Sequence, residues 1–289
     1  MKKKWYRGKV FVITGATGEI GSATCRLFAP LGMRMYLLDL ENTPLDKLAE
    51  EMKELGAEHA EGMVMDVTNR EQIENVIKTI VKKEKYIDIL HNNAGFGNKT
   101  SITNEGKFED YRKIMECNVD GVWLVLQTAR PYIGRPAPTK KFPDRREGQL
   151  IITASSGGKV GIPNMAAYVM SKHALVGLAD SIRLEYRMKD HKIHVITICP
   201  APAKTKFWDS TPEFKEWITK YEKKSFLYQY VTAEKVAKNI RKASRKNIKE
   251  ILVPRWWWAV VFIRTISHGF IGNFMIKIEK GKQNTPKNK

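Results

Sequence analysis

The stretch that decides the fold covers residues 9–39 and reads KVFVITGATGEIGSATCRLFAPLGMRMYLLD. An apolar run, KVFVIT, leads through a glycine-rich turn into a segment of helical period at residues 20–31, and a second apolar run, RMYLLD, follows. Neither run alternates apolar with polar residues, which indicates strands that are buried on both faces. Because a helical connection between two such strands requires parallel pairing, this stretch predicts one strand-helix-strand unit of a parallel sheet.

The same alternation continues along the chain to residue 254. We expect further strands at residues 61–66, 87–92, 148–155, 192–200 and 250–254, and helices at residues 45–55, 71–83, 111–130, 166–186 and 233–243. The sequence thus predicts an α/β protein with a Rossmann-type, doubly wound parallel sheet of about seven strands, covered by helices on both sides. Residues 1–254 would form this single domain, and residues 255–289 a C-terminal extension.

The composition is that of one globular domain in a reducing compartment. Of the 289 residues, 43% are hydrophobic and 28% are charged, which is enough for one substantial core. Three cysteines, Cys25, Cys117 and Cys199, are too few and too scattered for a disulfide framework or a zinc cluster. The first residues, MKKKWYRGKV, lack the apolar stretch of a secretory signal. We therefore expect a cytoplasmic protein without a metal site.

Positive charge is concentrated in the last third of the chain. The net charge is +19, and residues 206–289 hold nineteen basic and seven acidic side chains. Three interpretations stay open: a solubilising tail, contact with an anionic membrane surface, and binding to nucleic acid. No nucleic-acid-binding motif accompanies the lysines, so we expect no nucleic acid partner.

The glycine-rich turn TGATGEIG, residues 14–21, is typical of a phosphate-binding loop. It follows the first strand and opens a helix, so its backbone amides can face a pyrophosphate while the helix N-terminus favours negative charge. The turn predicts a dinucleotide cofactor, with contacts from Gly15, Thr17, Gly18, Glu19, Ile20 and Gly21.

Asp39 ends the second apolar run, RMYLLD. A carboxylate at this place can accept hydrogen bonds from the adenosine ribose and repel a 2′-phosphate, so Asp39 favours NAD over NADP. A solvated aspartate at a strand end is the alternative. Arg34 or Lys47 would weaken the preference for NAD if either side chain moved close to the site.

Tyr168 and Lys172 lie four residues apart in YVMSK, which places them on one face of the predicted helix. A neighbouring ammonium stabilises a phenolate and brings proton exchange by tyrosine within range of neutral pH. Because such a pair also arises by chance, two further positions matter. Ser155 ends the strand at residues 148–155 and can meet the same substrate oxygen, and Asn118 lies within a helix that its amide can perturb while holding a water. The alternatives are a capping serine and an exposed asparagine.

Taken in order, these motifs resemble the classical short-chain dehydrogenase/reductase (SDR) family over residues 8–205. The resemblance rests on TGATGEIG, Asp39, the pair Asp66 and Val67, the NNAG of residues 92–95, Asn118, Ser155, and Tyr168 with Lys172. It implies direct hydride transfer between a nicotinamide cofactor and a substrate carbon, so that no metal is needed.

The resemblance also implies a role for each residue. Tyr168 would transfer the hydroxyl proton, Ser155 would polarise the substrate oxygen, and Lys172 would lower the pKa of the tyrosine and bind the nicotinamide ribose. Asn118 would hold the water that links Lys172 to solvent. The remaining cofactor contacts that the resemblance implies are Asp66, Val67, Asn93, Ala94, Gly95, Pro200 and Thr205.

Three features depart from the family pattern. Glu19 stands where the family has glycine, with Gly18 one place earlier, and a carboxylate there also disfavours NADP. Ala201 and Ala203 replace the usual glycine and valine in the loop after residues 192–200. Residues 134–148 form a longer connection than usual, and their richness in proline and charge predicts an exposed loop.

Aromatic side chains are interspersed with charges in residues 204–230. This pattern suits an amphipathic cover over a lipophilic substrate cleft. Ordinary packing of the aromatic side chains is the alternative.

The C-terminal segment, residues 255–289, begins RWWWAVVFIR. Its uninterrupted apolar run, residues 256–263, is shorter than the about 20 residues of a spanning helix. Tryptophans beside arginine and a lysine-rich tail predict instead a segment that lies at an anionic membrane surface. A homodimer contact and a helix packed on the domain are the alternatives, and His268 is interpreted as structural.

Such a C-terminal segment resembles the SDR branch that acts on steroids, retinoids and long-chain ketones. We therefore expect an NAD-dependent dehydrogenase of a lipophilic secondary alcohol or ketone, in the cytoplasm at a membrane surface. The runner-up hypothesis is a soluble 3-oxoacyl carrier protein reductase whose basic surface docks an acidic carrier. A dinucleotide-binding regulator without turnover is the third, and the complete set of Asn118, Ser155, Tyr168 and Lys172 disfavours it.

Overall fold

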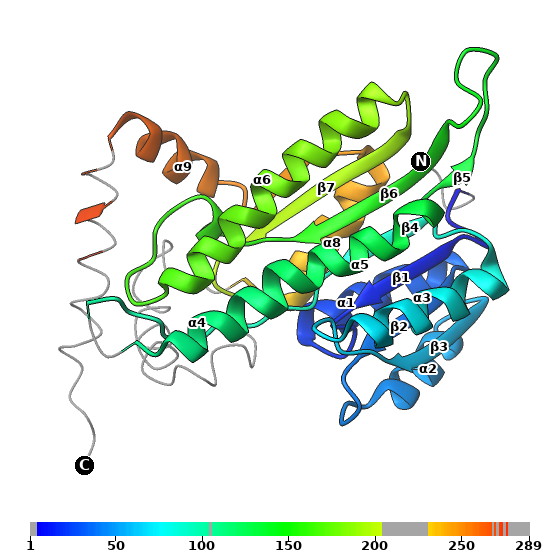
Figure 1. Cartoon of the computed structure of the whole chain (residues 1–289), viewed down its shortest axis with the longest axis horizontal. Helices are drawn as coiled ribbons and strands as arrows, with labels where there is room; N and C mark the ends of the chain where they lie inside the picture. Colours follow the sequence, from blue (N-terminus) through cyan, green and yellow to red (C-terminus); the bar gives the residue numbers. More distant parts are fainter. Residues whose placement is uncertain are drawn as a thin grey trace.

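The described residues of the computed structural model form one central sheet of eight strands: seven lie in the order β3-β2-β1-β4-β6-β7-β8, and β5 pairs with β6 off this path (Figure 1). The structure describes residues 5–103, 106–203 and 231–267, with residues 269, 272, 273 and 276. These seven strands are parallel to their neighbours, which confirms the predicted doubly wound sheet. Their bounds are β1 Val10–Thr14, β2 Arg34–Asp39, β3 His59–Val64, β4 Ile89–Asn92, β6 Arg146–Thr153, β7 Lys192–Pro200 and β8 Glu250–Val253.

Helices cover both faces of the sheet (Figure 1). Phe11 and Ile13 of β1 pack in one layer with α1, α2 and α8, while Val10 and Val12 pack in the other layer with α3, α5 and α6. The strand is therefore apolar at every position because successive side chains enter opposite cores. The helix bounds are α1 Glu19–Phe28, α2 Leu45–Glu54, α3 Arg70–Glu84, α4 Phe108–Met115, α5 Gly121–Ala129, α6 Ala166–Met188 and α8 Ala233–Lys246.

The helix predicted at residues 111–130 is interrupted in its middle. A π-helical turn, Glu116–Asp120, separates α4 from α5, and Asn118 lies inside that turn. Such single π turns are rare and occur frequently at functional sites. The perturbation of this helix at Asn118, expected from the sequence, is thus present.

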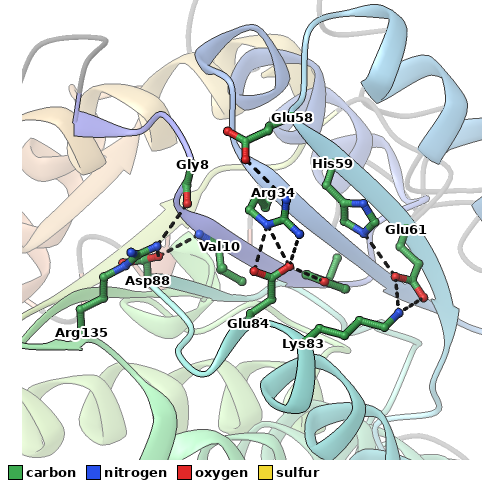
Figure 2. Close-up of polar contacts among 11 residues, drawn as sticks. Gly8, Val10, Arg34, Glu58, His59, Glu61, Lys83, Glu84, Asp88 and Arg135 are labelled. Carbon is green, nitrogen blue, oxygen red and sulfur yellow. Dashed lines mark hydrogen bonds and ion pairs between the residues drawn. The ribbon is translucent and has the colours of Figure 1, made fainter.

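Residues 134–148 form a hairpin rather than only a loop. The short strand β5, Arg135–Pro136, pairs antiparallel with the start of β6, so that β6 begins at Arg146 within the predicted loop. The Arg135 guanidinium binds the buried Asp88 carboxylate, with Nε to Oδ1 at 2.7 Å and Nη2 to Oδ2 at 2.9 Å (Figure 2). Asp88 also accepts the Val10 amide at 2.8 Å. This partly buried contact ties the hairpin to the sheet, and composition alone does not reveal it.

A second group of charged side chains lies at the amino end of β2 (Figure 2). Arg34 donates to Glu84 through Nη2 at 2.7 Å and through Nε at 2.9 Å, and the Tyr36 hydroxyl donates to the same carboxylate at 2.6 Å. Arg34 begins β2 and Asp39 ends it. The sequence-based concern that Arg34 moves close to Asp39 therefore does not hold, because its guanidinium is bound at the opposite end of the strand.

The chain after β8 forms helix α9, Trp257–Ile266, at the end of the molecule opposite the β5–β6 hairpin (Figure 1). Trp257 and Val261 pack against the core, whereas Trp258, Phe262 and Ile266 are exposed. In the described part of the chain, no helix is both long and apolar enough to span a bilayer. The predicted cover at residues 204–230 and His268 lie outside the described residues.

Candidate active site

A cavity of about 930 Å³ opens at the carboxyl ends of the parallel strands. In open α/β sheets, ligands bind at this edge, near the point where the strand order reverses. The order of this sheet reverses at β1 and β4. The cavity brings together most of the residues that the sequence singled out: Gly15, Thr17, Gly18, Glu19, Ile20, Asp39, Asp66, Val67, Asn93, Ala94, Gly95, Ser155, Tyr168, Lys172 and Pro200.

Three glycines shape the turn between β1 and α1. Gly15 has φ +63°, and a Cβ there would lie 2.9 Å from the Ala94 Cα, while a Cβ on Gly21 would lie 2.1 Å from the Gly15 carbonyl oxygen. Gly21 therefore supports the turn from below instead of lining the cavity. Gly18 is the N-cap of α1 without a side-chain cap, and an added Cβ would meet only the Gly15 carbonyl oxygen within 4 Å. A pyrophosphate can thus approach the helix N-terminus closely.

The NNAG segment packs directly on this turn. Asn93 Nδ2 donates to the Gly15 carbonyl oxygen at 3.0 Å, and the amides of Asn93 and Ala94 both donate to Thr14 Oγ1 at 3.1 Å. These bonds hold the ends of β1 and β4 at a fixed separation. Asn93, Ala94 and Gly95 therefore form the floor of the cavity between the glycine turn and Lys172.

Two aspartates line the cavity at the ends of neighbouring strands. Asp39 accepts hydrogen bonds from Thr17, through the backbone amide at 2.8 Å and the hydroxyl at 2.6 Å. Asp66 accepts the Thr68 amide and hydroxyl, each at 2.8 Å, and Val67 lies beside it. Sequence reasoning missed the contact between Thr17 and Asp39, because it joins the turn after β1 to the end of β2.

Ser155, Tyr168 and Lys172 converge at the other end of the cavity. Ser155 follows β6, and Tyr168 and Lys172 lie on the first turns of α6, with exposed fractions of 8%, 7% and 4%. The Ser155 and Tyr168 side chains are hydrogen bonded to each other, and Ser155 Oγ also accepts the Gly157 amide at 3.0 Å. Ser155 is therefore not only a capping residue, because its hydroxyl caps the next turn and also binds the tyrosine.

Burial controls the proton affinities of this pair. Desolvation raises the pKa of Tyr168 to about 12, and its hydrogen bond with Ser155 opposes the rise. Desolvation lowers the pKa of Lys172 to about 8. The expected lowering of the tyrosine pKa by Lys172 is not seen in this arrangement. Lys172 Nζ instead donates to the Thr153 carbonyl oxygen at 3.2 Å and lies 5.7 Å from the centre of the Tyr168 ring.

Asn118 lies behind the cavity floor and is fully buried. Its Oδ1 accepts the Phe96 amide at 3.0 Å, and its Nδ2 donates to the Phe96 carbonyl oxygen at 2.8 Å and to Ser171 Oγ at 3.0 Å. A Cβ on Gly95 would lie 2.9 Å from Asn118 Oδ1 and 3.3 Å from Lys172 Nζ. The amide thus joins the segment after β4 to helix α6 beside Lys172.

Thr153 connects Lys172 to Asn93 in the cavity floor, and sequence reasoning missed it. Its carbonyl oxygen accepts Lys172, its hydroxyl donates to Asn93 Oδ1 at 3.1 Å, and His91 Nε2 lies 2.8 Å from the same hydroxyl. The available signal was the two-residue period of strands, because Thr153 precedes Ser155 by two positions. Thr205 lies outside the described residues.

Comparison with known proteins agrees with this geometry. The sequence model of the short chain dehydrogenase family matches residues 9–216. The chain belongs to the short-chain dehydrogenase family. It is an NAD(P)-dependent oxidoreductase of CH–OH groups, and the family resemblance expected from its motifs is confirmed.

The chain is similar in sequence to a curated protein and similar in fold to solved structures. It is 31% identical over 206 residues to the 3-oxoacyl-[acyl-carrier-protein] reductase FabG of Thermotoga maritima, covering 71% of this chain and 78% of the relative. A short-chain dehydrogenase from Burkholderia phymatum, solved with NAD, has TM-score 0.78 and 24% identity, covering 92% and 95% of the two chains. Actinorhodin polyketide ketoreductase, solved with NADPH, has TM-score 0.71 and 26% identity, covering 83% and 90%.

Proposed function

We propose that this dehydrogenase transfers a hydride between NAD and a lipophilic secondary alcohol or ketone, with Tyr168 as the general acid and base. The observation that carries the proposal is the convergence of Ser155, Tyr168 and Lys172 at one end of a cavity whose other end holds the glycine turn and Asp39. A nicotinamide cofactor in the cavity would supply or accept the hydride.

The chain itself supplies proton transfer and polarisation. A tyrosine with a pKa of about 12 is protonated at neutral pH, so in the reductive direction Tyr168 holds the proton that a carbonyl oxygen must receive. Ser155 is bonded to that hydroxyl and can donate to the same substrate oxygen. In the oxidative direction a phenolate is required, and a protonated Lys172 on the adjacent helical turn would favour it. Asn118 would act by holding Phe96, after β4, and Ser171, the neighbour of Lys172 on α6, in fixed positions.

NAD is the proposed cofactor because Glu19, at the glycine turn, and Asp39, at the end of β2, are both among the carboxylates that line the cavity. Asp39 and Glu19 both face the space in which the adenosine half would lie, and a 2′-phosphate would bring further negative charge beside them. Asp66, Val67 and Pro200 complete the proposed cofactor contacts. The relatives include structures with NAD and with NADPH, so this preference rests on the carboxylates of this chain.

The lipophilic substrate is inferred from the lining near the catalytic residues. Phe96, Ile162, Pro202 and Ala203 are among the apolar residues that line the cavity, and Phe96 is 39% exposed. An apolar wall favours a hydrophobic body on the substrate, while Ser155 and Tyr168 bind its oxygen. Steroids, retinoids and long-chain keto compounds have this character.

A second candidate function is reduction of 3-oxoacyl groups presented on an acidic carrier protein. Two observations favour it: the likeness to the Thermotoga maritima reductase and the net charge of +19. A basic surface attracts an acidic carrier and speeds association at low salt.

One assay separates the two candidates. Purified protein is mixed with NAD, NADP, NADH or NADPH and with a panel of steroid, retinoid and long-chain secondary alcohols or ketones, and absorbance is followed at 340 nm. A 3-oxoacyl thioester, free and carrier-bound, completes the panel. Tyr168-dependent turnover of a lipophilic alcohol with NAD would support the first proposal. Turnover confined to the carrier-bound thioester would support the second and exclude the first.

We further propose that α9 docks this enzyme on an anionic membrane surface from the cytoplasmic side. Phe262 is 65% exposed and Ile266 71% exposed, one helical turn apart, with Trp258 one turn before. Arg264 Nη1 donates to the Lys159 carbonyl oxygen at 2.7 Å, which fixes the helix so that this apolar face points outward. Such a face with a lysine-rich sequence after it suits the headgroup level of a bilayer.

Replacing Phe262 and Ile266 together with glutamate should abolish this docking. Sedimentation with vesicles of phosphatidylcholine and phosphatidylserine should fall at least tenfold, because each apolar side chain contributes about 1.5–3 kcal/mol on burial. Deleting residues 255–289 should have the same effect. Met188→Glu, at an 83% exposed apolar position on the far end of α6, is the matched control and should sediment normally. Equal sedimentation of all four proteins would exclude α9 as a membrane contact.

A further inference from the structure

The Asp39 carboxylate is held in place by three hydrogen-bond donors. Oδ2 accepts the Thr17 amide at 2.8 Å and the Thr17 hydroxyl at 2.6 Å, and Oδ1 accepts the Leu40 amide at 2.9 Å. Thr17 belongs to the turn after β1, whereas Asp39 ends β2. Hydrogen bonds from Thr17 to the Asp39 carboxylate therefore join the glycine turn to the residue that would face the adenosine ribose.

We infer that Thr17 is a positioning residue that sets the discrimination between NAD and NADP by fixing the Asp39 carboxylate inside the cavity. The inference rests on the proposed function, since it requires that Asp39 faces the ribose of a bound NAD. Thr17 acts through Asp39, and its own contact with the cofactor is not what the inference invokes.

The Thr17 hydroxyl cannot donate to Asp39 and to a phosphate at the same time. A threonine hydroxyl has one proton to donate, and here it is given to Asp39. The remaining lone pairs on Thr17 Oγ1 can only accept, so this side chain offers a phosphate no donor while the bond persists. Hydrogen bonds to a carboxylate are also stronger than those between neutral groups.

Hydrogen bonds from Thr17 and Leu40 restrict rotation of the Asp39 carboxylate. An ionised carboxylate has about four acceptor positions, and three donors already bind Asp39, so about one position is left for a ribose hydroxyl. To admit a 2′-phosphate, the carboxylate would have to turn away and break its bonds with Thr17. A mobile aspartate would exclude the phosphate less strictly, because it could rotate at little cost.

A lysine or arginine beside Asp39 would offset the negative charge of its carboxylate and make a 2′-phosphate easier to admit. Among the residues that line the cavity in the described ranges, the lysines and arginines are Lys113 on α4 and Lys172 on α6. Neither lies on the elements that carry Thr17 and Asp39. Arg34, on the same strand as Asp39, is bound to Glu84 at the other end (Figure 2). The fixed carboxylate is therefore not neutralised by a neighbour on β2.

The test measures dissociation constants of NADH and NADPH by nucleotide fluorescence with the full-length chain. Thr17→Val removes the hydroxyl, keeps the side-chain shape and keeps the backbone amide, and Thr17→Ser restores a hydroxyl. We expect the ratio of the NADPH to the NADH dissociation constant to fall about tenfold in Thr17→Val, from loss of a charge-assisted hydrogen bond, and to stay near the wild-type value in Thr17→Ser. Each ratio is taken within one protein, so a partly unfolded fraction changes signal amplitude and not the ratio.

The double variant with Asp39→Ala separates positioning from direct contact. If Thr17 acts through Asp39, adding Thr17→Val to Asp39→Ala leaves the ratio unchanged. An unchanged ratio in Thr17→Val alone, or an equal fall in both backgrounds, would overturn the inference while the proposed NAD-dependent function stands. A wild-type preference for NADPH would instead overturn the proposed cofactor, and the inference with it.

Discussion

Tyr168→Phe is expected to lower kcat by about a hundredfold or more, the usual cost of losing a general acid or base. The phenylalanine ring fills the same buried space but cannot give a proton to the substrate oxygen. The loss should appear in kcat, while the dissociation constant of NADH stays near the wild-type value. Measurement of kcat by absorbance at 340 nm and of NADH binding by fluorescence checks both parts.

Tyr186→Phe is the matched control for this variant. Tyr186 lies on the same helix, α6, and is also partly buried, but it does not line the cavity. It should keep wild-type kcat, so a loss confined to Tyr168→Phe cannot come from a general disturbance of α6. Retention of more than a tenth of wild-type kcat by Tyr168→Phe would contradict the role of Tyr168 as the proton donor.

The sheet could be predicted because each strand can be recognised from its own residues. A strand buried on both faces is apolar at every position, as Val10, Phe11, Val12 and Ile13 show. Such an apolar run can be recognised in the sequence without knowing which strands pair with it. The glycine turn could also be recognised from its own residues, because glycines at positions 15, 18 and 21 meet its backbone requirements. The positions of most candidate site residues followed from the strand ends, since parallel strands bring their carboxyl ends to one edge.

The proton affinities could not be predicted, because they depend on burial that no local pattern encodes. The Tyr168 and Lys172 spacing suggested a tyrosine with a lowered pKa, yet desolvation raises it to about 12. The sequence places the two residues on one helical face but does not reveal that Lys172 donates to the Thr153 carbonyl oxygen.

Contacts between distant strands were equally hidden. The bond between Arg135 and buried Asp88 joins residues 47 positions apart, and Arg135 lies in a short strand that pairs with β6 inside the predicted loop. The bonds from Thr17 to Asp39 join residues 22 positions apart. In both cases each residue alone is typical of an exposed polar position, and only the folded pairing gives it a specific role.

His91→Gln should make the protein less sensitive to acid. His91 is fully buried beneath the cavity, and desolvation lowers its pKa from 6.5 to about 3. Between these two values the unfolded chain binds a proton that the folded chain does not, so the free energy of unfolding falls as the pH falls. From pH 6.5 to pH 4 this loss is on the order of 3 kcal/mol, and a glutamine, which does not titrate, removes it.

Urea unfolding at a series of pH values between 7 and 4 measures this effect. The wild type and His91→Gln both lose stability from their carboxylates, so the difference between their two curves reports the histidine. Glutamine can still bond the Thr153 hydroxyl that His91 contacts, which limits other damage at the site. Parallel curves for the wild type and His91→Gln would mean that the folded protein accepts a proton at His91 as readily as the unfolded chain.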